Sequence, residues 1–238
     1  QDVDVIAASF VRSAKDVLEI RELLNANGGN NINIISKIEN SEGVNHIDDI
    51  IYVSDGIMVA RGDMGVEIPC EEVPVIQKMI INKVYMAGKQ VITATQMLDS
   101  MIKNPRPTRA ETTDVANAIY DGTSAVMLSG ESAAGKYPVE AVEMMAKIAE
   151  RAEAAIDYKK NFFHYERAAN QNVTDAVCHA ACTTAIDLNA AAVIIVTKSG
   201  VSARNISKYR PSCNIIAGTT SDKAYRQLNM SWGVTPVH

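Results

Sequence analysis

Four short apolar runs of this chain each end in a cluster of polar residues. The runs and their polar endings span residues 34–39, 57–63, 91–96 and 126–131. Each run favours a β-strand, and a helical pattern follows each one. This alternation is typical of a parallel (β/α) barrel, whose strands carry reactive groups to one rim at their carboxyl ends. The sequence therefore predicts an α/β fold with a catalytic site at that rim.

Composition limits the classes of function that the chain can serve. Its 238 residues suffice for one large domain or two ordinary ones, and 47% of them are hydrophobic, enough for a full core. A net charge of −5 argues against a general surface for nucleic acid or anionic membranes. No apolar stretch approaches the ~20 residues of a membrane span, and the start does not resemble a signal peptide. We therefore expect neither a nucleic-acid partner nor a membrane partner.

The four cysteines show no pattern of a metal site. Cys70, Cys178, Cys182 and Cys213 include no pair with C-x-x-C spacing. Cys178 and Cys182 lie four residues apart on a predicted helix, where small core residues are expected. We interpret the cysteines as buried free thiols, which favours a reducing, cytoplasmic location.

Strand and helix patterns alternate five times before residue 157. Strands are predicted to end near residues 10, 39, 63, 95 and 129, and helices to cover residues 41–51, 72–87, 108–122 and 138–157, among others. A barrel of this type closes with eight strands. Residues 1–157 are therefore predicted to form the last five strands of a partial (β/α)8 barrel, with three strand–helix units lost before Gln1.

A second domain is predicted from residue 158 to residue 238. The pattern loosens over residues 158–172, and helices at 173–188, 202–208 and 222–229 then alternate with strands at 192–197, 214–217 and 233–237. Such alternation with short loops predicts a three-layer parallel α/β domain. The sequence stops on an apolar strand, so we expect this domain to be truncated.

Lys37, Glu39 and Asp63 are the strongest candidates for chemistry. Lys37 and Glu39 lie two apart on a predicted strand and so point to the same face. Lysine supplies a positive point charge, and Glu39 and Asp63 could together hold one Mg²⁺. The alternative is a structural ion pair within the strand.

A glycine-bearing turn follows the second of the four runs. Gly62 and Gly65 would let successive backbone N–H groups turn toward a ligand and form an anion nest. Beside Lys37, Glu39 and Asp63, this turn would suit a substrate carboxylate. The alternative is an ordinary βα turn.

Hydroxyls and a carboxylate follow the last two of the four runs. Thr95, Ser129 and Glu131 could relay a proton through water. Each of these residue types is also common in purely structural roles.

A possible phosphate site lies in the second domain. Thr197, Lys198, Ser199, Gly200 and Ser202 stand between a strand and a helix. Hydroxyls, a lysine and helix-terminal N–H groups together favour phosphate binding. The alternative is helix capping by Ser199 or Ser202.

Long ordered motifs resemble the pyruvate kinase family across essentially the whole chain. The matching residues are 32–44, 58–67, 94–98, 104–111 and 127–131. The resemblance implies phosphoryl transfer between phosphoenolpyruvate and ADP, with pyruvate and ATP as products, as the last step of glycolysis.

The resemblance also implies roles for individual residues. Lys37 matches the lysine that offsets charge on the phosphoryl group in flight, and Glu39 and Asp63 match the ligands of Mg²⁺ or Mn²⁺. The turn of Ala60, Arg61, Gly62 and Asp63 matches the element that holds the substrate carboxylate. Thr95 matches the threonine near the enolate carbon, which also makes it a substrate-binding residue, and Ser129 and Glu131 match the proposed proton route.

Further partners follow from the same resemblance. Residues 197–202 align with the phosphate loop of a sugar-phosphate effector site, and residues 104–118 resemble a contact between subunits of a homotetramer. The resemblance also implies K⁺, with its ligands outside this chain.

Two other readings of the sequence stay open. Lys37, Glu39 and Asp63 would equally serve a lyase or aldolase barrel that handles a pyruvate enolate on Mg²⁺. A chain with only five barrel strands would also leave two unpaired sheet edges. It could then be a catalytically inert fragment that packs and binds effector.

Overall fold

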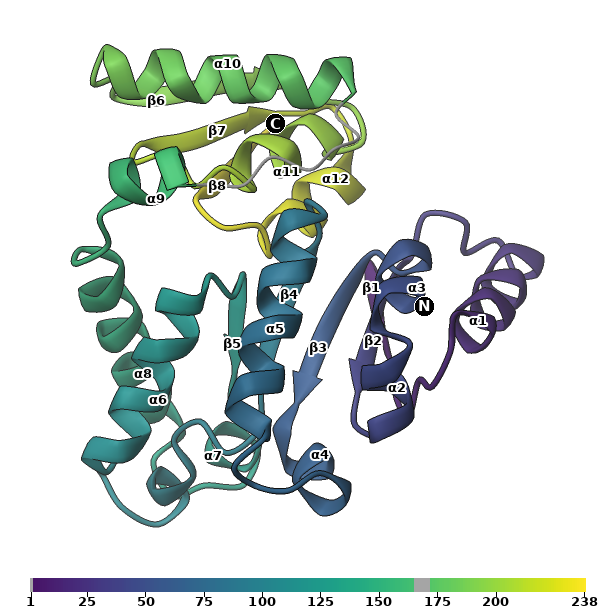
Figure 1. Ribbon diagram of the computed structural model, residues 1–238, viewed down its shortest axis with the longest axis vertical. Coiled ribbons are helices and arrows are strands. Elements are labelled where there is room, and N and C mark those ends of the chain that lie inside the picture. The colour runs from purple at the N-terminus through teal and green to yellow at the C-terminus, as the bar shows by residue number, and fades with distance from the viewer. Residues whose placement is uncertain (1, 165–171) are drawn as a thin grey trace. The chain divides into compact units, whose positions relative to one another are not determined.

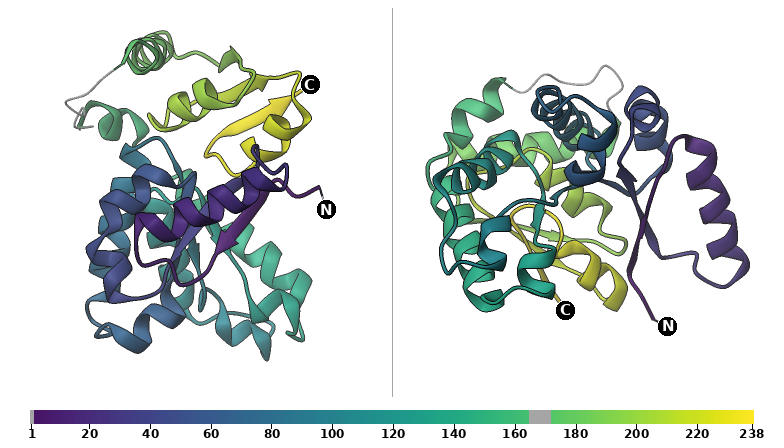
Figure 2. Two further views of the ribbon diagram at one scale, coloured as in Figure 1. Left: turned by 90° about the vertical axis from the view of Figure 1, so that its right-hand side faces the viewer. Right: turned by 90° about the horizontal axis from the view of Figure 1, so that it is seen from below.

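The computed structural model describes residues 2–164 and 172–238. The chain divides into two units, shown as ribbons in Figures 1 and 2. The larger unit contains Val5–Tyr85 and Gln90–Ile156. The smaller unit contains the described residues from Asp157 onward, with the short segments 2–4 and 86–89.

Five parallel strands form the sheet of the larger unit, in the same order as in the sequence. They are β1 (Val5–Ala8), β2 (Asn33–Ile38), β3 (Gly56–Ala60), β4 (Gln90–Ala94) and β5 (Ala125–Met127). Every strand is followed by at least one helix, as the sequence predicted. The α/β class and the run of strand–helix units are therefore confirmed.

Eight helices and one 3₁₀ turn accompany this sheet in the described residues. They are α1 (Ala14–Ala26), α2 (Ser41–Asn45), α3 (Ile47–Val53), α4 (Arg61–Glu67), α5 (Val73–Met86), η1 (Asp99–Ile102), α6 (Arg109–Asp121), α7 (Gly130–Ala133) and α8 (Pro138–Glu153). Seen from below, the longer helices lie in an arc around the strands (Figure 2).

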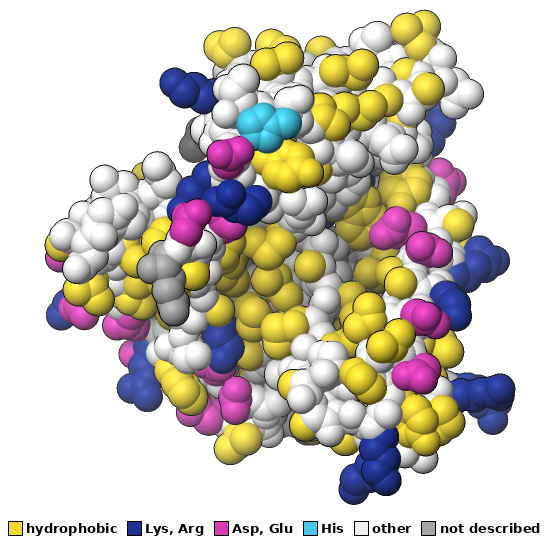
Figure 3. Space-filling view, turned by 180° about the vertical axis from the view of Figure 1, so that it is seen from behind, with side chains coloured by type: hydrophobic (Ala, Val, Ile, Leu, Met, Phe, Trp, Pro, Cys, Tyr) yellow, Lys and Arg dark blue, Asp and Glu magenta, His cyan; other side chains and the backbone are white. Residues whose placement is uncertain are grey.

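The core of the larger unit lies between the sheet and its helices. Alternate residues of the strands, such as Ile34, Ile57 and Val91, pack with Ile80 and Val84 of α5 in one fully buried cluster. Burial of each such side chain stabilises the fold by about 1.5–3 kcal/mol. The opposite face of the sheet is seen from behind in Figure 3, where apolar side chains also gather.

Local capping fixes the start of α6 as the sequence predicted. The Thr108 N–H donates to Glu111 Oε2 at 2.7 Å, and the Glu111 N–H donates to Thr108 Oγ1 at 3.2 Å. This reciprocal pair satisfies two helix donors that lack partners within the helix. Glu111 also accepts from the Ser100 N–H and hydroxyl, which ties η1 to the helix start.

Several short helices depart from the predicted boundaries. The strand expected to reach Asp63 stops at Ala60, and α4 begins at Arg61. The helix expected over residues 41–51 is divided at His46 into α2 and α3. Helices of four to seven residues, which include α4 and α7, are too short to show a 3.6-residue apolar period.

The smaller unit has three parallel strands in the order β6 (Ala192–Val196), β7 (Asn214–Gly218) and β8 (Val234–Val237). Its described helices are α9 (Tyr158–His164), α10 (Val173–Asp187), α11 (Val201–Ser207) and α12 (Asp222–Leu228). The sequence did not predict α9, and the rest of the loosened stretch, residues 165–171, lies outside the described residues.

The described helices of the smaller unit share one apolar core with one face of its sheet. Cys182 of α10 and Ile206 of α11 pack with Ile215 of β7. Ile194 and Val196 point to the other face and are exposed. The second helical layer expected from the sequence is therefore not seen among the residues described.

The cysteines are free, but they are not all buried. Cys178 and Cys182 are buried on α10 as predicted. Cys213 is partly exposed and Cys70 is exposed, so the expectation of burial is wrong for these two. Cys70 lies in the connection between α4 and α5, outside both helices and the sheet. Among the described helices, none has the length and apolar character needed to span a bilayer.

Candidate active site

The carboxyl ends of all five strands of the larger unit meet along one edge of its sheet. The register pairs Ala8 with Ser36, Ile38 with Val59, and Ala60 with Ala94. Ala94 in turn pairs with Met127. Several of the predicted polar residues follow these strand ends by one or two positions. The register therefore places those of neighbouring strands side by side.

Lys37 and Glu39 form an ion pair at this edge. Lys37 Nζ lies 2.6 Å from Glu39 Oε1 and donates to Ser9 Oγ at 3.0 Å. The Glu39 side chain is only 1% exposed, and its Oε2 accepts from the Phe10 N–H at 2.5 Å. The two side chains point to the same face, as predicted. A buried carboxylate held in this way keeps the ammonium group of Lys37 at the rim.

Asp63 supplies a second carboxylate near the same edge. It stands in the first turn of α4, two residues after Arg61, and it is exposed. In the part of the chain that the structure describes, no group of three or more His, Cys, Asp or Glu side chains is placed to hold a metal. Mg²⁺ usually takes only one or two protein carboxylates and completes its shell with water and substrate oxygens. The donor set of Glu39 and Asp63 therefore fits Mg²⁺ chemically.

The predicted anion nest is not formed. A nest needs left-handed residues in its turn, but Gly62 and Gly65 lie within the right-handed helix α4, and neither has a positive φ. The Gly62 N–H donates to Thr95 Oγ1 at 2.8 Å. The backbone after Ala60 is thus a helix start at the rim, with one of its N–H groups turned to a hydroxyl of the next strand.

The Arg61 side chain is turned into the protein. Its guanidinium group is bonded to both carboxylate oxygens of Asp114 and to the backbone oxygens of Thr95 and Gln96. The side chain is only 10% exposed. Among the predicted substrate-binding residues, Arg61 is therefore the one whose charged group is already fully engaged by the chain itself.

Thr95 holds its hydroxyl at the end of β4 in an unusual conformation. Its φ is +70°, and that of Gln96 is +54°. A β-branched residue rarely adopts the left-handed region. The Thr95 hydroxyl donates to the Ala94 carbonyl at 2.6 Å and accepts from Gly62.

Glu131 joins the loops that follow β4 and β5. It is 1% exposed, its Oε1 accepts from the Leu98 N–H at 3.0 Å, and its Oε2 accepts from the Ser129 N–H at 2.8 Å. The Glu131 carboxylate therefore fixes the backbone of Ser129 relative to the loop after Thr95. The structure brings Thr95, Ser129 and Glu131 to one region, at the ends of adjacent strands.

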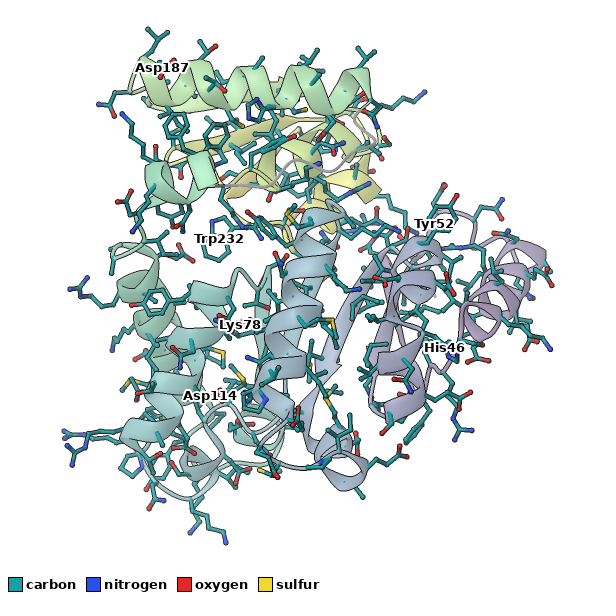
Figure 4. The ribbon with its side chains drawn as sticks, in the orientation of Figure 1. His46, Tyr52, Lys78, Asp114, Asp187 and Trp232 are labelled. Carbon is teal, nitrogen blue, oxygen red and sulfur yellow. The ribbon has the colours of Figure 1, made fainter. Side chains whose placement is uncertain are left out.

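Sequence reasoning missed Ser9, Phe10 and Asp114. Ser9 and Phe10 directly follow the first strand, and no charged cluster marks its end in the sequence. Asp114 lies on α6, on the side that faces α5 (Figure 4). Its partner Arg61 is 53 positions away in the sequence, so no local pattern could have paired them.

The predicted phosphate loop of the smaller unit lies between β6 and α11. Gly200 is the N-cap of α11 with φ +80°, and its N–H donates to Thr197 Oγ1 at 3.1 Å. Helix capping by Ser199 or Ser202 is therefore not observed. Thr197 is buried, whereas Lys198 and Ser199 are exposed and Ser202 is partly exposed. Thr197, Lys198, Ser199 and Gly200 form the turn before α11, and Ser202 lies in the first turn of this helix.

Comparison with known proteins decides the family of the chain. The model of the pyruvate kinase barrel domain matches residues 1–142, and the model of the pyruvate kinase alpha/beta domain matches residues 175–238. The chain belongs to the pyruvate kinase family. The family match agrees with the resemblance of the sequence motifs and with the parallel sheets of both units.

Individual relatives from this family cover almost the whole chain. A pyruvate kinase of Clostridium acetobutylicum is 61% identical over 239 aligned residues, which cover 100% of this chain and 50% of the relative. A pyruvate kinase of Sporosarcina psychrophila is 60% identical over 100% of this chain and 40% of its own length. One from Geobacillus stearothermophilus is 56% identical over 98% of this chain and 40% of its own length. The chain thus spans about half or less of these relatives.

Proposed function

We propose that the complete protein transfers a phosphoryl group from phosphoenolpyruvate to ADP, giving pyruvate and ATP. The observation that carries this proposal is the Lys37–Glu39 pair, 2.6 Å apart, at the sheet edge where the strand ends converge. The membership of the pyruvate kinase family supports the same reaction. A phosphotransferase of this kind depends on positioned charge more than on covalent chemistry.

Lys37 opposes negative charge on the phosphoryl group during transfer. Its ammonium is held by Glu39 and Ser9, so it needs no reorganisation when the charge develops. Glu39 and Asp63 would hold Mg²⁺ or Mn²⁺, which supplies further charge neutralisation on substrate oxygens when bound. The start of α4, from Ala60 to Asp63, would receive the substrate carboxylate through backbone N–H groups other than that of Gly62, which is bonded to Thr95.

Protonation of the enolate at carbon completes the reaction. We assign this step to the rim near Thr95, whose hydroxyl lies between the end of β4 and the start of α4. Ser129 and Glu131 support the route from the end of β5. Both oxygens of Glu131 accept from backbone N–H groups, so this carboxylate holds the backbone along the proton route. Water carries the proton past the Thr95 hydroxyl.

The finer properties of the family complete the proposal. Residues 1–157 form the carboxyl-terminal part of a catalytic barrel, and residues 158–238 form an effector-binding domain. Thr197, Lys198, Ser199, Gly200 and Ser202 bind a phosphate of a sugar-phosphate effector. The complete protein is a cytoplasmic homotetramer that uses K⁺.

Replacement of Lys37 tests the reaction. Lys37→Met in the complete encoded polypeptide should lower kcat by roughly 10²–10³, because one preorganised charge is lost at the transition state. Lys83→Met is the matched control, since Lys83 pairs with the exposed Asp48 away from the rim, and it should keep its activity. Activity of Lys37→Met within tenfold of the parent would overturn the role of Lys37.

Omission of ADP tests the reaction class. A phosphotransferase forms no pyruvate without a nucleotide acceptor, whereas a lyase acting on a pyruvate enolate needs none. Product formation that does not depend on ADP would contradict the proposal. The Lys37→Met and Lys83→Met variants are assayed with and without ADP. Loss of ADP-independent pyruvate formation in Lys37→Met alone would show that this product comes from the same site.

A further inference from the structure

Two successive residues after β4 adopt a backbone conformation that they do not favour. Thr95 and Gln96 have φ values of +70° and +54°, and neither is glycine. Such conformations persist only when the surrounding structure holds them in place. This turn carries the hydroxyl of Thr95, so the contacts that hold the turn also fix the position of that hydroxyl.

One guanidinium group binds the carbonyl oxygens of both residues. Arg61 Nε and Nη2 donate to the Thr95 oxygen at 3.2 and 2.7 Å, and Nη2 also donates to the Gln96 oxygen at 3.2 Å. The next residue of α4 adds a bond from the Gly62 N–H to Thr95 Oγ1 at 2.8 Å. The start of α4 therefore holds the turn through the Gly62 backbone N–H and the Arg61 side chain.

Asp114 in turn fixes the guanidinium group. Its two carboxylate oxygens accept from Arg61 Nη1 at 2.7 and 2.6 Å, and Gln77 Oε1 lies 3.4 Å from the same nitrogen. Asp114 reaches this point from α6 (Figure 4). Gln77 belongs to α5. A charge-assisted pair of this kind has a strong directional preference. The orientation of Arg61 is thus set by a helix that itself carries none of the predicted site residues.

We propose that Asp114 and Arg61 are positioning residues that hold the Thr95 hydroxyl where it serves proton transfer to the enolate carbon. Asp114 orients Arg61, and Arg61 holds the strained turn. This inference rests on the proposed function. In this inference the Arg61 side chain holds the turn and does not contact the substrate directly.

Exchange of the methyl protons of pyruvate isolates the step in question. With pyruvate, Mg²⁺ and K⁺ present and ATP withheld, phosphoryl transfer cannot occur. A C–H bond of the methyl group breaks, its proton passes to the relay, and a deuteron from D₂O returns to the same carbon. Proton NMR of the complete encoded polypeptide in D₂O therefore measures this step alone.

Asp114→Ala should slow this exchange at least tenfold while KM for phosphoenolpyruvate stays within threefold. Asp121→Ala is the matched control, because Asp121 lies on the same helix and pairs with the exposed Lys78. It should leave the exchange rate unchanged. An Asp114→Ala exchange rate equal to that of Asp121→Ala would overturn the inference.

A double variant separates positioning from a general loss of structure. If Asp114 acts through Thr95, the pair Asp114→Ala with Thr95→Val should exchange no more slowly than Thr95→Val alone, within twofold. Independent losses that multiply would overturn the inference. Arg61→Lys keeps the charge but loses the two-pronged geometry, and it should show the same non-additivity with Thr95→Val. It replaces Asp114→Ala in this test if Asp114→Ala does not fold.

Thr95→Val alone separates a failure of the proposed role of Thr95 from a failure of the positioning role of Asp114 and Arg61. If it leaves exchange intact, the proposed role of Thr95 fails, and the positioning role fails with it. If it abolishes exchange while Asp114→Ala and Arg61→Lys do not slow it, the proposed function stands and only the positioning inference is overturned.

Discussion

Lys208 Nζ lies 2.5 Å from Asp175 Oδ1, and both side chains are about nine-tenths buried in the smaller unit. The Tyr209 hydroxyl donates to the same oxygen at 2.8 Å. Asp175 is in the first turn of α10, and Lys208 directly follows α11, so this cluster joins the two helices.

Removal of one partner of this pair should destabilise the smaller unit strongly. Asp175→Asn leaves Lys208 as a buried charge without its counter-ion, for which we expect a loss of about 3–5 kcal/mol in the free energy of unfolding. Asp222→Asn is the control, because its pairing with His238 is exposed and should contribute at most ~1 kcal/mol. Urea unfolding followed by Trp232 fluorescence measures both, since Trp232 lies in this unit and is the one tryptophan in the chain.

Acid should weaken the same cluster. Burial opposes ionisation of Asp175, but hydrogen bonds from Lys208 and Tyr209 outweigh it and hold its pKa below the usual value. A carboxyl whose pKa is lowered by folding stabilises the fold above its unfolded pKa, near ~3.9, and loses that contribution as pH falls through the folded pKa. The stability difference between the parent and Asp175→Asn should therefore shrink below about pH 4. A difference that stays constant from pH 7 to pH 3 would contradict this.

The cysteines should react with alkylating reagents in the order of their exposure. Burial, followed by the nearby Cys178 and Cys213, raises the pKa of Cys182 to about 12, so almost no thiolate forms there at neutral pH. Cys70 is exposed. Iodoacetamide at pH 8 should modify Cys70 first and Cys182 only after unfolding in urea, as peptide mass spectrometry can show. Modification of Cys182 in the folded chain at the rate of Cys70 would be inconsistent with this burial.

Gly200 should tolerate a side chain poorly. Its φ is +80°, and a Cβ there would lie 2.8 Å from Arg204 Nη1 and 3.1 Å from Leu228 Cδ2. Leu228 is fully buried, so Gly200→Ala should add a packing cost of about 1–3 kcal/mol to the backbone strain. Gly233→Ala is the control in the same unit, with φ +66° and no atom within 4 Å of the added carbon. Equal losses of stability in the two variants would show that packing at Gly200 is unimportant.

The sequence predicted the elements whose signals are local. Alternating apolar strands and helices were recognisable because their periods are short, and the start of α6 was recognisable because Thr108 and Glu111 cap it within three residues. The polar ends of the strands were predictable for the same reason, and Lys37 and Glu39 lie on one face because strand geometry places residues i and i+2 together.

The tertiary structure alone decided how these residues are held. Nothing near Arg61 in the sequence points to Asp114, and nothing near Asp175 points to Lys208, 33 positions away. The positive φ values of Thr95 and Gln96 run against the preferences of both residue types. Local sequence determines the conformations that a segment favours, whereas contacts between distant segments determine which unfavourable conformation or buried charge the fold can stabilise.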